Sequence, residues 1–334
     1  MTLRDLSLPA DLEELGPMLA ESFQYPENPD WGVQDDERES LIEDINSLRR
    51  WWWMINIAQL FSKKMRGILP GKVWIEDGKI AGAVLYQRRG SSDNWLIGTV
   101  ATHPDYRRRG IAHKLVKASL EDIQSKNAKT VVLDVIDANL PAYQLYTSLG
   151  FEHFTGTLDL EFPPSRIVPE PEFPAEYRLV PTNNFDWQAR YQISKRISPE
   201  NLQRYDPVTE ALFQQPSFMR LIIPIFNNAQ KIEEKLFVVE HIPSNENVGY
   251  FRSSARQGGK GRHTTAIRLD PKHAQLARPM LEYALHQVTS TDPNLVVEMA
   301  LPAWQKEVAE AAYEIGFEKR VQYHRLGLKI EKEV

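Results

Sequence analysis

Short apolar runs bounded by polar and turn-forming residues recur along the first half of the chain, as is typical of strands. Strands are predicted over residues 72–76 and 79–87, on either side of Asp77-Gly78, a dipeptide typical of tight hairpin turns. A third strand is predicted over residues 95–102, and the short apolar run over residues 131–136 predicts a buried strand. Together these segments predict a strand meander followed by a buried strand.

Apolar residues at helical spacing separate these strands. A helix is predicted to begin at Gly110 and to end near Ser125, because Ile111, Leu115 and Ile123 recur at intervals close to the helical period. A further strand is predicted over residues 3–6, and further helices over residues 11–23 and 141–149. Strands and helices therefore occur together, and the fold class is predicted to be α/β, with an α+β type of mixed sheet.

The same order of segments returns in the second half of the chain. Gly82 and Gly249 lie 167 positions apart, as do Pro104 and Pro271, and two Gly-Phe pairs lie 166 positions apart. Such a period indicates two copies of one fold. The copies are predicted over residues 1–160 and 177–334, with a proline-rich linker over residues 161–176 and an insert in the first copy at about residues 28–70.

Composition argues against several classes of function. The 334 residues include no run near the roughly 18 apolar residues of a membrane span, and the first residues lack the apolar core of a secretory signal. A cytoplasmic protein that does not enter a membrane is therefore predicted. The net charge of -5, with basic residues spread along the chain, argues against a nucleic-acid partner. The absence of cysteine excludes disulfides, thiolate metal ligands and a cysteinyl intermediate, and no metal site is predicted.

Three consecutive arginines stand at the start of a predicted helix, where cations are unfavourable. Arg107, Arg108 and Arg109 oppose the helix dipole by roughly 0.3–1 kcal/mol each, which indicates that an anion binds there. Gly110 and Ala112 lack bulk, so the backbone amides around them can approach phosphate oxygens. The pattern predicts a pyrophosphate site, and the alternative is a solvated basic turn before an ordinary helix.

Two segments carry a family resemblance. Arg107, Gly110 and Ala112 match the pattern Arg/Gln-x-x-Gly-x-Gly/Ala, and the segment resembles the pyrophosphate loop of the GNAT superfamily of N-acetyltransferases. Residues 139–151 carry an asparagine, an alanine, a Leu-Tyr pair and a Gly-Phe pair at the spacing of the same family. The resemblance implies two tandem GNAT-like domains, each a central, mostly antiparallel sheet flanked by helices, and it implies acetyl-CoA as the cosubstrate.

The resemblance also implies roles for particular residues. The strand before the loop would bind the pantetheine arm of acetyl-CoA through Val100, Ala101 and Thr102. Asn139 would hydrogen-bond that arm or the chain around it, and the sequence alone predicts that it caps the helix that follows. The residues implied to hold the pyrophosphate are Arg107, Arg108, Arg109, Gly110, Ile111, Ala112 and His113.

Tyr146 is the catalytic residue that the resemblance implies, as proton donor to the departing CoA thiolate. From the residues alone, a tyrosine that closes the core is the alternative. The strand predicted over residues 95–102 contains no acidic residue, although many members of the family carry a base there, so no general base is assigned. Glu76, Asp77 and Asp93 are expected to be solvated turn residues.

The second copy lacks the residues of the predicted site. The positions of Arg107, Gly110, Ala112 and Tyr146 align with Ala274, Ala277, Pro279 and Ala312, and Tyr313 lies one position after the last of these. A proline has no amide hydrogen, so a phosphate cradle at this place is weakened. The C-terminal domain is therefore predicted to be a degenerate, non-catalytic copy, and residues 258–262 are predicted to form a hairpin loop.

The predicted activity is transfer of an acetyl group from acetyl-CoA to a primary amine of a small molecule or peptide, by direct attack within a ternary complex. The alternative is a non-catalytic protein that binds acyl-CoA as a sensor or interaction partner. The insert is rich in aromatic residues, among them Trp31 and Trp51. It is interpreted as packing between domains or against a second subunit, which leaves a homodimer open, or as recognition of the acceptor.

Overall fold

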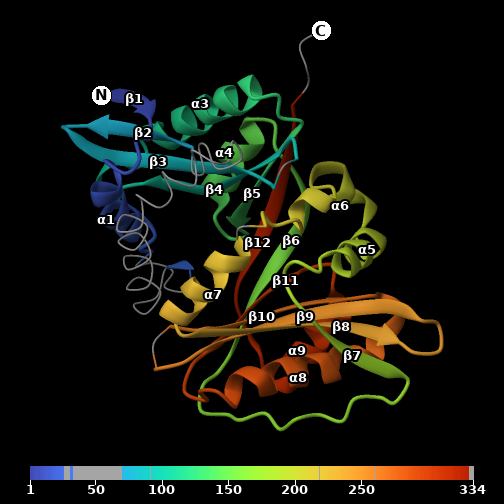
Figure 1. Cartoon of the computed structure of the whole chain (residues 1–334). Coiled ribbons are helices and arrows are strands. Elements are labelled where there is room, and N and C mark those ends of the chain that lie inside the picture. Colours follow the sequence, from blue (N-terminus) through green and yellow to red (C-terminus); the bar gives the residue numbers. More distant parts are fainter. Residues whose placement is uncertain (26–30, 33–69, 91, 218, 260, 331–334) are drawn as a thin grey trace. The chain divides into compact units, whose positions relative to one another are not determined.

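The computed structural model describes the chain except residues 26–30, 33–69, 91, 218, 260 and 331–334 (Figure 1). The chain forms two compact units. Unit 1 comprises residues 1–153 together with residues 325–334, and unit 2 comprises residues 154–324. The sequence places the division at the proline-rich segment 161–176, whereas the compact units divide after His153, and the end of the chain returns to unit 1.

Unit 1 contains a strand meander and a buried strand, as predicted. Its elements are β1 (Thr2–Asp5), α1 (Leu12–Ser22), β2 (Gly71–Glu76), β3 (Lys79–Arg88), β4 (Asn94–Thr102), the 3₁₀ helix η3 (Pro104–Tyr106), α3 (Ile111–Ser125), β5 (Thr130–Ile136) and α4 (Leu140–Ser148). The strand order is β1-β2-β3-β4-β5, with antiparallel neighbours except for the parallel pair β4 and β5. The bounds predicted for the strands and helices of this unit agree with these elements to within one residue.

Helices cover both faces of the unit 1 sheet. Successive side chains of a strand point to opposite faces, so Val73 and Trp74 mark the two faces of β2. Leu15 and Leu19 of α1 pack in the cluster that contains Val73, whereas α3 packs in the cluster that contains Trp74. Apolar residues at helical spacing in α1 and α3 thus bury one stripe each against the sheet.

Unit 2 repeats this order of elements. It contains β6 (Glu152–Phe162), β7 (Tyr177–Thr182), α5 (Gln188–Ile197), α6 (Glu200–Tyr205), η4 (Glu210–Leu212), α7 (Met219–Ala229), β8 (Ile232–His241), β9 (Glu246–Arg256), β10 (His263–Leu269), η5 (Pro271–Leu276), α8 (Ala277–Thr289), β11 (Val297–Pro302), α9 (Lys306–Ile315) and most of β12 (Glu318–Lys329). The strand order from β6 is β6-β11-β10-β9-β8-β7, and β10 and β11 are parallel. The core of this unit contains the buried faces of α8 and α9.

The last strand of each copy continues from one unit into the other. The strand that follows α4, β6, pairs with β11 in unit 2 over residues 157–162. The strand that follows α9, β12, ends in unit 1, where Leu326 is buried and Ile330 donates from its amide to the Lys129 carbonyl at 2.9 Å. The tandem organisation predicted from the repeat is confirmed, with this exchange of strands added.

Backbone hydrogen bonds fix the alignment of the two copies. His103 donates to the Ala81 carbonyl at 3.0 Å, and Asp270 donates to the Val248 carbonyl at 2.8 Å, 167 positions later. At the end of α4, Phe151 donates to the Tyr146 carbonyl at 3.2 Å, and at the end of α9, Phe317 donates to the Ala312 carbonyl at 2.9 Å. Ala312 therefore occupies the position of Tyr146, as the sequence predicts.

Two further expectations concern loops and membranes. The segment 258–262 joins the antiparallel strands β9 and β10, as a hairpin loop does. Among the helices in the described part of the chain, none has both the length and the apolar character needed to cross a bilayer.

Candidate functional site

The two parallel strands at the centre of unit 1 separate part of the way along their length. β4 and β5 are in register over four pairs, from Asn94 with Thr130 to Ile97 with Leu133. On the other side of β4, Leu85 pairs with Thr99 and Tyr86 with Ile97, so Gly98 is an extra residue that forms a β-bulge. A bulge bends a strand, and the register between these two fully described strands ends there.

The alternation of the backbone decides which groups face the resulting gap. His103 donates to the Ala81 carbonyl on the β3 side, so the backbone groups of Thr102 and Val100 point to the opposite edge, toward β5. The backbone of Ala101 faces β3, and its side chain is buried in the cluster with α1. The Thr102 hydroxyl is buried and has no hydrogen-bond partner within the described residues. The backbone groups of Val100 and the Thr102 amide therefore lie on the edge of β4 that faces β5, where the Thr102 carbonyl accepts a bond from Arg107 Nε at 3.3 Å.

The loop between β4 and α3 has a backbone suited to an anion. Arg108 has φ of 64° and Gly110 has φ of 73°, both in the left-handed region. Residues of this kind curve the chain so that successive amides face one side. The first backbone bond of α3 runs from the Lys114 amide to the Gly110 carbonyl at 3.2 Å, so the amides of the three residues between them have no acceptor inside the helix. The loop therefore combines a concave set of donors with a helix N-terminus.

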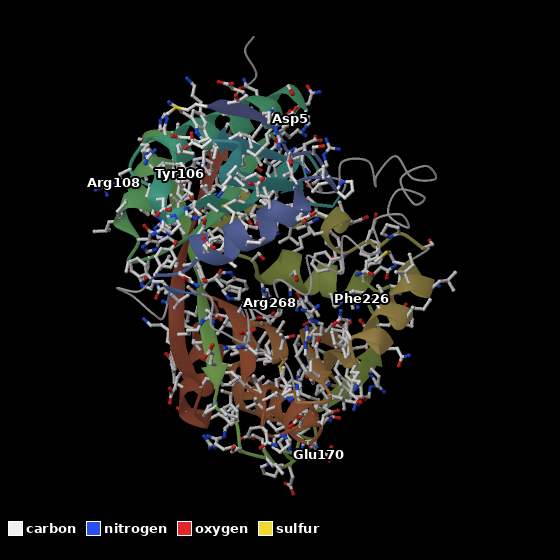
Figure 2. All side chains as sticks on the ribbon, turned by 90° about the vertical axis from the view of Figure 1, so that its left-hand side faces the viewer. Asp5, Tyr106, Arg108, Glu170, Phe226 and Arg268 are labelled. Atoms are coloured by element: carbon white, nitrogen blue, oxygen red, sulfur yellow. The ribbon has the colours of Figure 1, made fainter. Side chains whose placement is uncertain are left out.

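The three arginines of this loop differ in what they contact. The Arg107 guanidinium donates to the Ser22 carbonyl at 2.8 Å and to the Thr102 carbonyl at 3.3 Å. Arg109 donates to a Glu76 carboxylate oxygen at 3.1 Å and to the Asp105 carbonyl at 3.0 Å. Arg108 is exposed and projects away from the ribbon of unit 1 (Figure 2). Within the described residues, Arg108 makes no hydrogen bond or ion pair, so its charge is available to an anion.

Glu76 differs from its expected role. The side chain at the end of β2 was expected to be a solvated turn residue, but Glu76 is only 6 % exposed. Its carboxylate pairs with Arg109 and accepts a hydrogen bond from the Trp74 indole at 3.2 Å. The expectation was wrong because a contact 33 positions away along the chain buries the carboxylate. Asp93 does lie at the surface, paired with Lys129 at 3.2 Å.

Asn139 and Tyr146 belong to α4. The Asn139 Oδ1 accepts a hydrogen bond from the Ala142 amide at 3.2 Å, so the predicted helix cap is confirmed. Tyr146 is 6 % exposed, and its ring lies edge-on to that of Phe151 with 6.1 Å between centroids. Burial raises the pKa of the Tyr146 phenol well above its ordinary value, and the neighbouring phenol of Tyr25 adds to the shift. Tyr146 is therefore protonated at neutral pH.

Tyr25 lies near two of the predicted site residues, Arg107 and Tyr146, and the sequence did not single it out. The Arg107 guanidinium lies over its ring at 5.4 Å, and Trp31 packs edge-on to it with 5.8 Å between centroids. Burial raises the pKa of the Tyr25 phenol, while the charge of Arg107 acts in the opposite direction. An aromatic residue just after α1 was the available signal, but its proximity to Tyr146 arises only in the folded unit. Apart from residues 31, 32 and 70, the insert predicted at about residues 28–70 lies outside the described residues.

The corresponding loop of unit 2 has another backbone. The 3₁₀ helix η5 runs from Pro271 to Leu276 and continues directly into α8 at Ala277. Pro279 lies in the first turn of α8 and supplies no amide hydrogen.

Comparison with known proteins is consistent with this geometry. The acetyltransferase (GNAT) family model matches residues 26–151. The [ribosomal protein bS18]-alanine N-acetyltransferase of Escherichia coli (strain K12) is 30% identical over 80 residues, which are 24% of this chain and 53% of that protein. N-alpha-acetyltransferase 30 of Schizosaccharomyces pombe is 33% identical over 82 residues, 24% of this chain and 55% of that protein. The chain thus spans about half the length of these curated relatives.

Solved structures resemble the chain over its whole length. A GCN5-related N-acetyltransferase from Sphaerobacter thermophilus has a TM-score of 0.67 and 14% identity, with 99% of this chain and 97% of that chain covered. A tandem GNAT protein from the clavulanic acid biosynthesis pathway has a TM-score of 0.61 and 14% identity, with 100% of both chains covered. At this identity the likeness shows the fold alone. Residues 26–151 therefore match the acetyltransferase (GNAT) family model, and the chain as a whole has the fold of these two-domain GNAT structures.

Proposed function

We propose that unit 1 is an acetyl-CoA-dependent N-acetyltransferase that modifies a primary amine of a small molecule or peptide. The observation that carries the proposal is the position of the anion-binding loop, residues 107–113, at the end of the strand that opens away from β5. The loop and the strand edge match two parts of CoA. The loop matches its pyrophosphate group, and the strand edge matches its amide-containing pantetheine arm.

The residues of unit 1 fit this ligand. The amides of Ile111, Ala112 and His113 and the exposed charge of Arg108 would hold the pyrophosphate. The backbone groups of Val100 and Thr102, which face the gap, would pair with the amides of the pantetheine arm. Ala101 would act through its packing against α1, and Arg107 and Arg109 would hold the loop in shape through Ser22 and Glu76.

The chemistry requires one proton donor that unit 1 supplies. Acetyl-CoA supplies the acetyl thioester, and transfer forms a carbon–nitrogen bond to the amine as the carbon–sulfur bond breaks. The phenol of Tyr146, which is protonated at neutral pH, donates its proton to the departing sulfur and afterwards regains a proton from water. β4, over residues 94–102, carries no carboxylate, so we propose that the amine loses its proton to water.

The acceptor is proposed from the relatives. One relative is named for the alanine of ribosomal protein bS18 and another as an N-alpha-acetyltransferase. An α-amine at the N-terminus of a peptide is therefore the first acceptor class to test. We further propose that unit 2 binds no acetyl-CoA, since Ala274 and Ala312 stand at the positions of Arg107 and Tyr146.

The test is release of free CoA thiol from acetyl-CoA in the presence of peptides with a free or a blocked α-amine. The proposed function predicts thiol release with the free amine alone, and a product heavier by one acetyl group. An acyl-CoA-binding sensor would bind acetyl-CoA and release no thiol with any amine offered. Binding without release across α-amines, lysine side chains and small polyamines would overturn the enzymatic proposal.

A further inference from the structure

Gln305 makes a pair of hydrogen bonds that is unusual for a side chain. The Leu269 amide donates to Gln305 Oε1 at 2.8 Å, and Gln305 Nε2 donates to the Leu269 carbonyl at 2.9 Å. Gln305 is 1 % exposed. The register of β10 with β11 ends at Thr265 and Met299, so at Leu269 the side-chain amide of Gln305 takes the place of a neighbouring strand.

The same two positions exist in unit 1. Leu269 and Thr102 are the last residues of β10 and β4, and each precedes a residue whose amide bonds back to the previous strand. Gln305 and Asn139 are the residues before α9 and α4, and their carbonyls accept the first helical hydrogen bonds, at 3.1 Å and 3.0 Å. Gln305 therefore corresponds to Asn139, and Leu269 corresponds to Thr102.

The two residues before the helices, Gln305 and Asn139, differ by one methylene group in the side chain. The Asn139 Oδ1 is turned to its own helix, where it accepts from the Ala142 amide at 3.2 Å. Thr102 keeps its backbone directed to the gap, and its carbonyl accepts a 3.3 Å bond from Arg107 Nε. In unit 2 the longer side chain of Gln305 reaches the strand instead. A glutamine amide has the donor and acceptor of the amides in a pantetheine arm.

We propose that Gln305 is an internal plug, which occupies in unit 2 the backbone groups that the pantetheine arm occupies in unit 1. The length of the residue before the last helix decides whether a copy admits the arm. For unit 1 this inference rests on the proposed function. For unit 2 it rests on the hydrogen bonds alone, because a ligand that displaced Gln305 would have to replace two buried bonds.

The first experiment transfers the plug to unit 1. Asn139→Gln should fill the gap beside Thr102, and Asn139→Ala is the matched variant that loses the helix cap without adding a plug. Calorimetric titration with CoA should give a Kd for Asn139→Gln at least about tenfold higher than that for Asn139→Ala. Equal Kd values for the two folded variants, in a protein whose wild type binds CoA, would overturn the plug.

The second experiment needs no CoA binding. Hydrogen exchange of the free protein, read by mass spectrometry, should be slow in peptides over residues 266–270 and faster over residues 99–103. Gln305→Ala should speed exchange at Leu269, Asn139→Gln should slow it at Thr102, and Lys306→Ala, at an exposed neighbouring position, should change neither. Unchanged exchange at Leu269 in Gln305→Ala would overturn the plug, whereas absence of CoA binding with the expected exchange would overturn the proposed function instead.

Discussion

Arg107 donates a hydrogen bond from its Nη2 to the carbonyl of Ser22 at 2.8 Å and so joins the loop before α3 to the last residue of α1. The same guanidinium bonds Thr102 and lies over Tyr25. Arg107, the arginine of the family motif, thus links the proposed cofactor loop to the end of α1 and to the segment that follows it. Its neighbour Arg108 is exposed and makes no bond within the described residues.

This difference predicts distinct effects for two adjacent arginines. Arg107→Ala should lower the free energy of unfolding by about 1.5–3 kcal/mol, because it leaves partly buried carbonyls without a charged donor. Arg108→Ala should leave the Tm unchanged and raise the Kd for CoA about five- to tenfold, with a weaker dependence on salt. Thermal unfolding and calorimetry measure both quantities. A large fall in Tm with Arg108→Ala, or none with Arg107→Ala, would contradict the assignment.

Two glycines provide a matched test of the loop. Gly110 has φ of 73° and Gly78, in the β2–β3 hairpin, has φ of 76°, and a Cβ at either would meet no atom within 4 Å. Alanine at each should cost about 1 kcal/mol of stability, because the left-handed conformation is strained for a residue with a Cβ. Gly110→Ala should also raise the Kd for CoA several-fold, whereas Gly78→Ala should leave it unchanged. Equal Kd values in the two variants would remove the loop from the binding site.

Tyr146 should matter for turnover more than for binding. Tyr146→Phe removes the proposed proton donor and keeps the ring, so kcat should fall about 10²-fold with little change in the Kd for CoA. Tyr313→Phe is the control, because this tyrosine of α9 lies one position after the equivalent Ala312 and is 44% exposed. Steady-state thiol release measures both. Undiminished kcat in Tyr146→Phe would show that another group protonates the leaving sulfur.

Stability should depend on pH through His263. Its ring is fully buried, accepts from the Arg256 amide at 3.0 Å and donates to the Asp292 carbonyl at 2.7 Å. Burial lowers the pKa of His263 below its ordinary value, so below pH of about 6.5 the unfolded chain binds this proton more readily than the folded protein. The contribution of neutral His263 is present above that pH and is lost as the pH falls through the lowered pKa.

The measurement is Tm between pH 7.5 and 5.5. His263→Gln should unfold at lower temperature than wild type at pH 7.5 and lose less Tm on acidification, whereas His113→Gln, at an exposed position, should keep the wild-type slope. A wild-type slope in His263→Gln would show that other groups govern acid unfolding.

Local signals predicted much of the fold and part of the site. The hairpin at Asp77-Gly78 and the cap at Asn139 depend on neighbouring residues, so the sequence specifies them directly. The 167-residue period revealed the tandem order because both copies keep a glycine in equivalent strands, β3 and β9, and a proline at the start of η3 and η5.

The remaining features depend on contacts between distant parts of the chain. Glu76 and Arg109 are 33 positions apart, and Ser22 and Arg107 are 85 apart, so no periodicity reveals either pair. The bulge at Gly98 follows from the register of β3 with β4, which a single strand does not encode. The exchange of β6 and β12 likewise requires pairing across more than 100 residues.

The measurement that tests the central claim most directly is calorimetric titration of acetyl-CoA into the wild-type chain and into Arg108→Ala. The account predicts one site per chain, weakened in the variant, because within the described parts of the two units only unit 1 combines an open strand edge with the proposed anion-binding loop. Absence of binding to the wild type would contradict the proposed function, and two sites per chain would contradict the closed, degenerate unit 2.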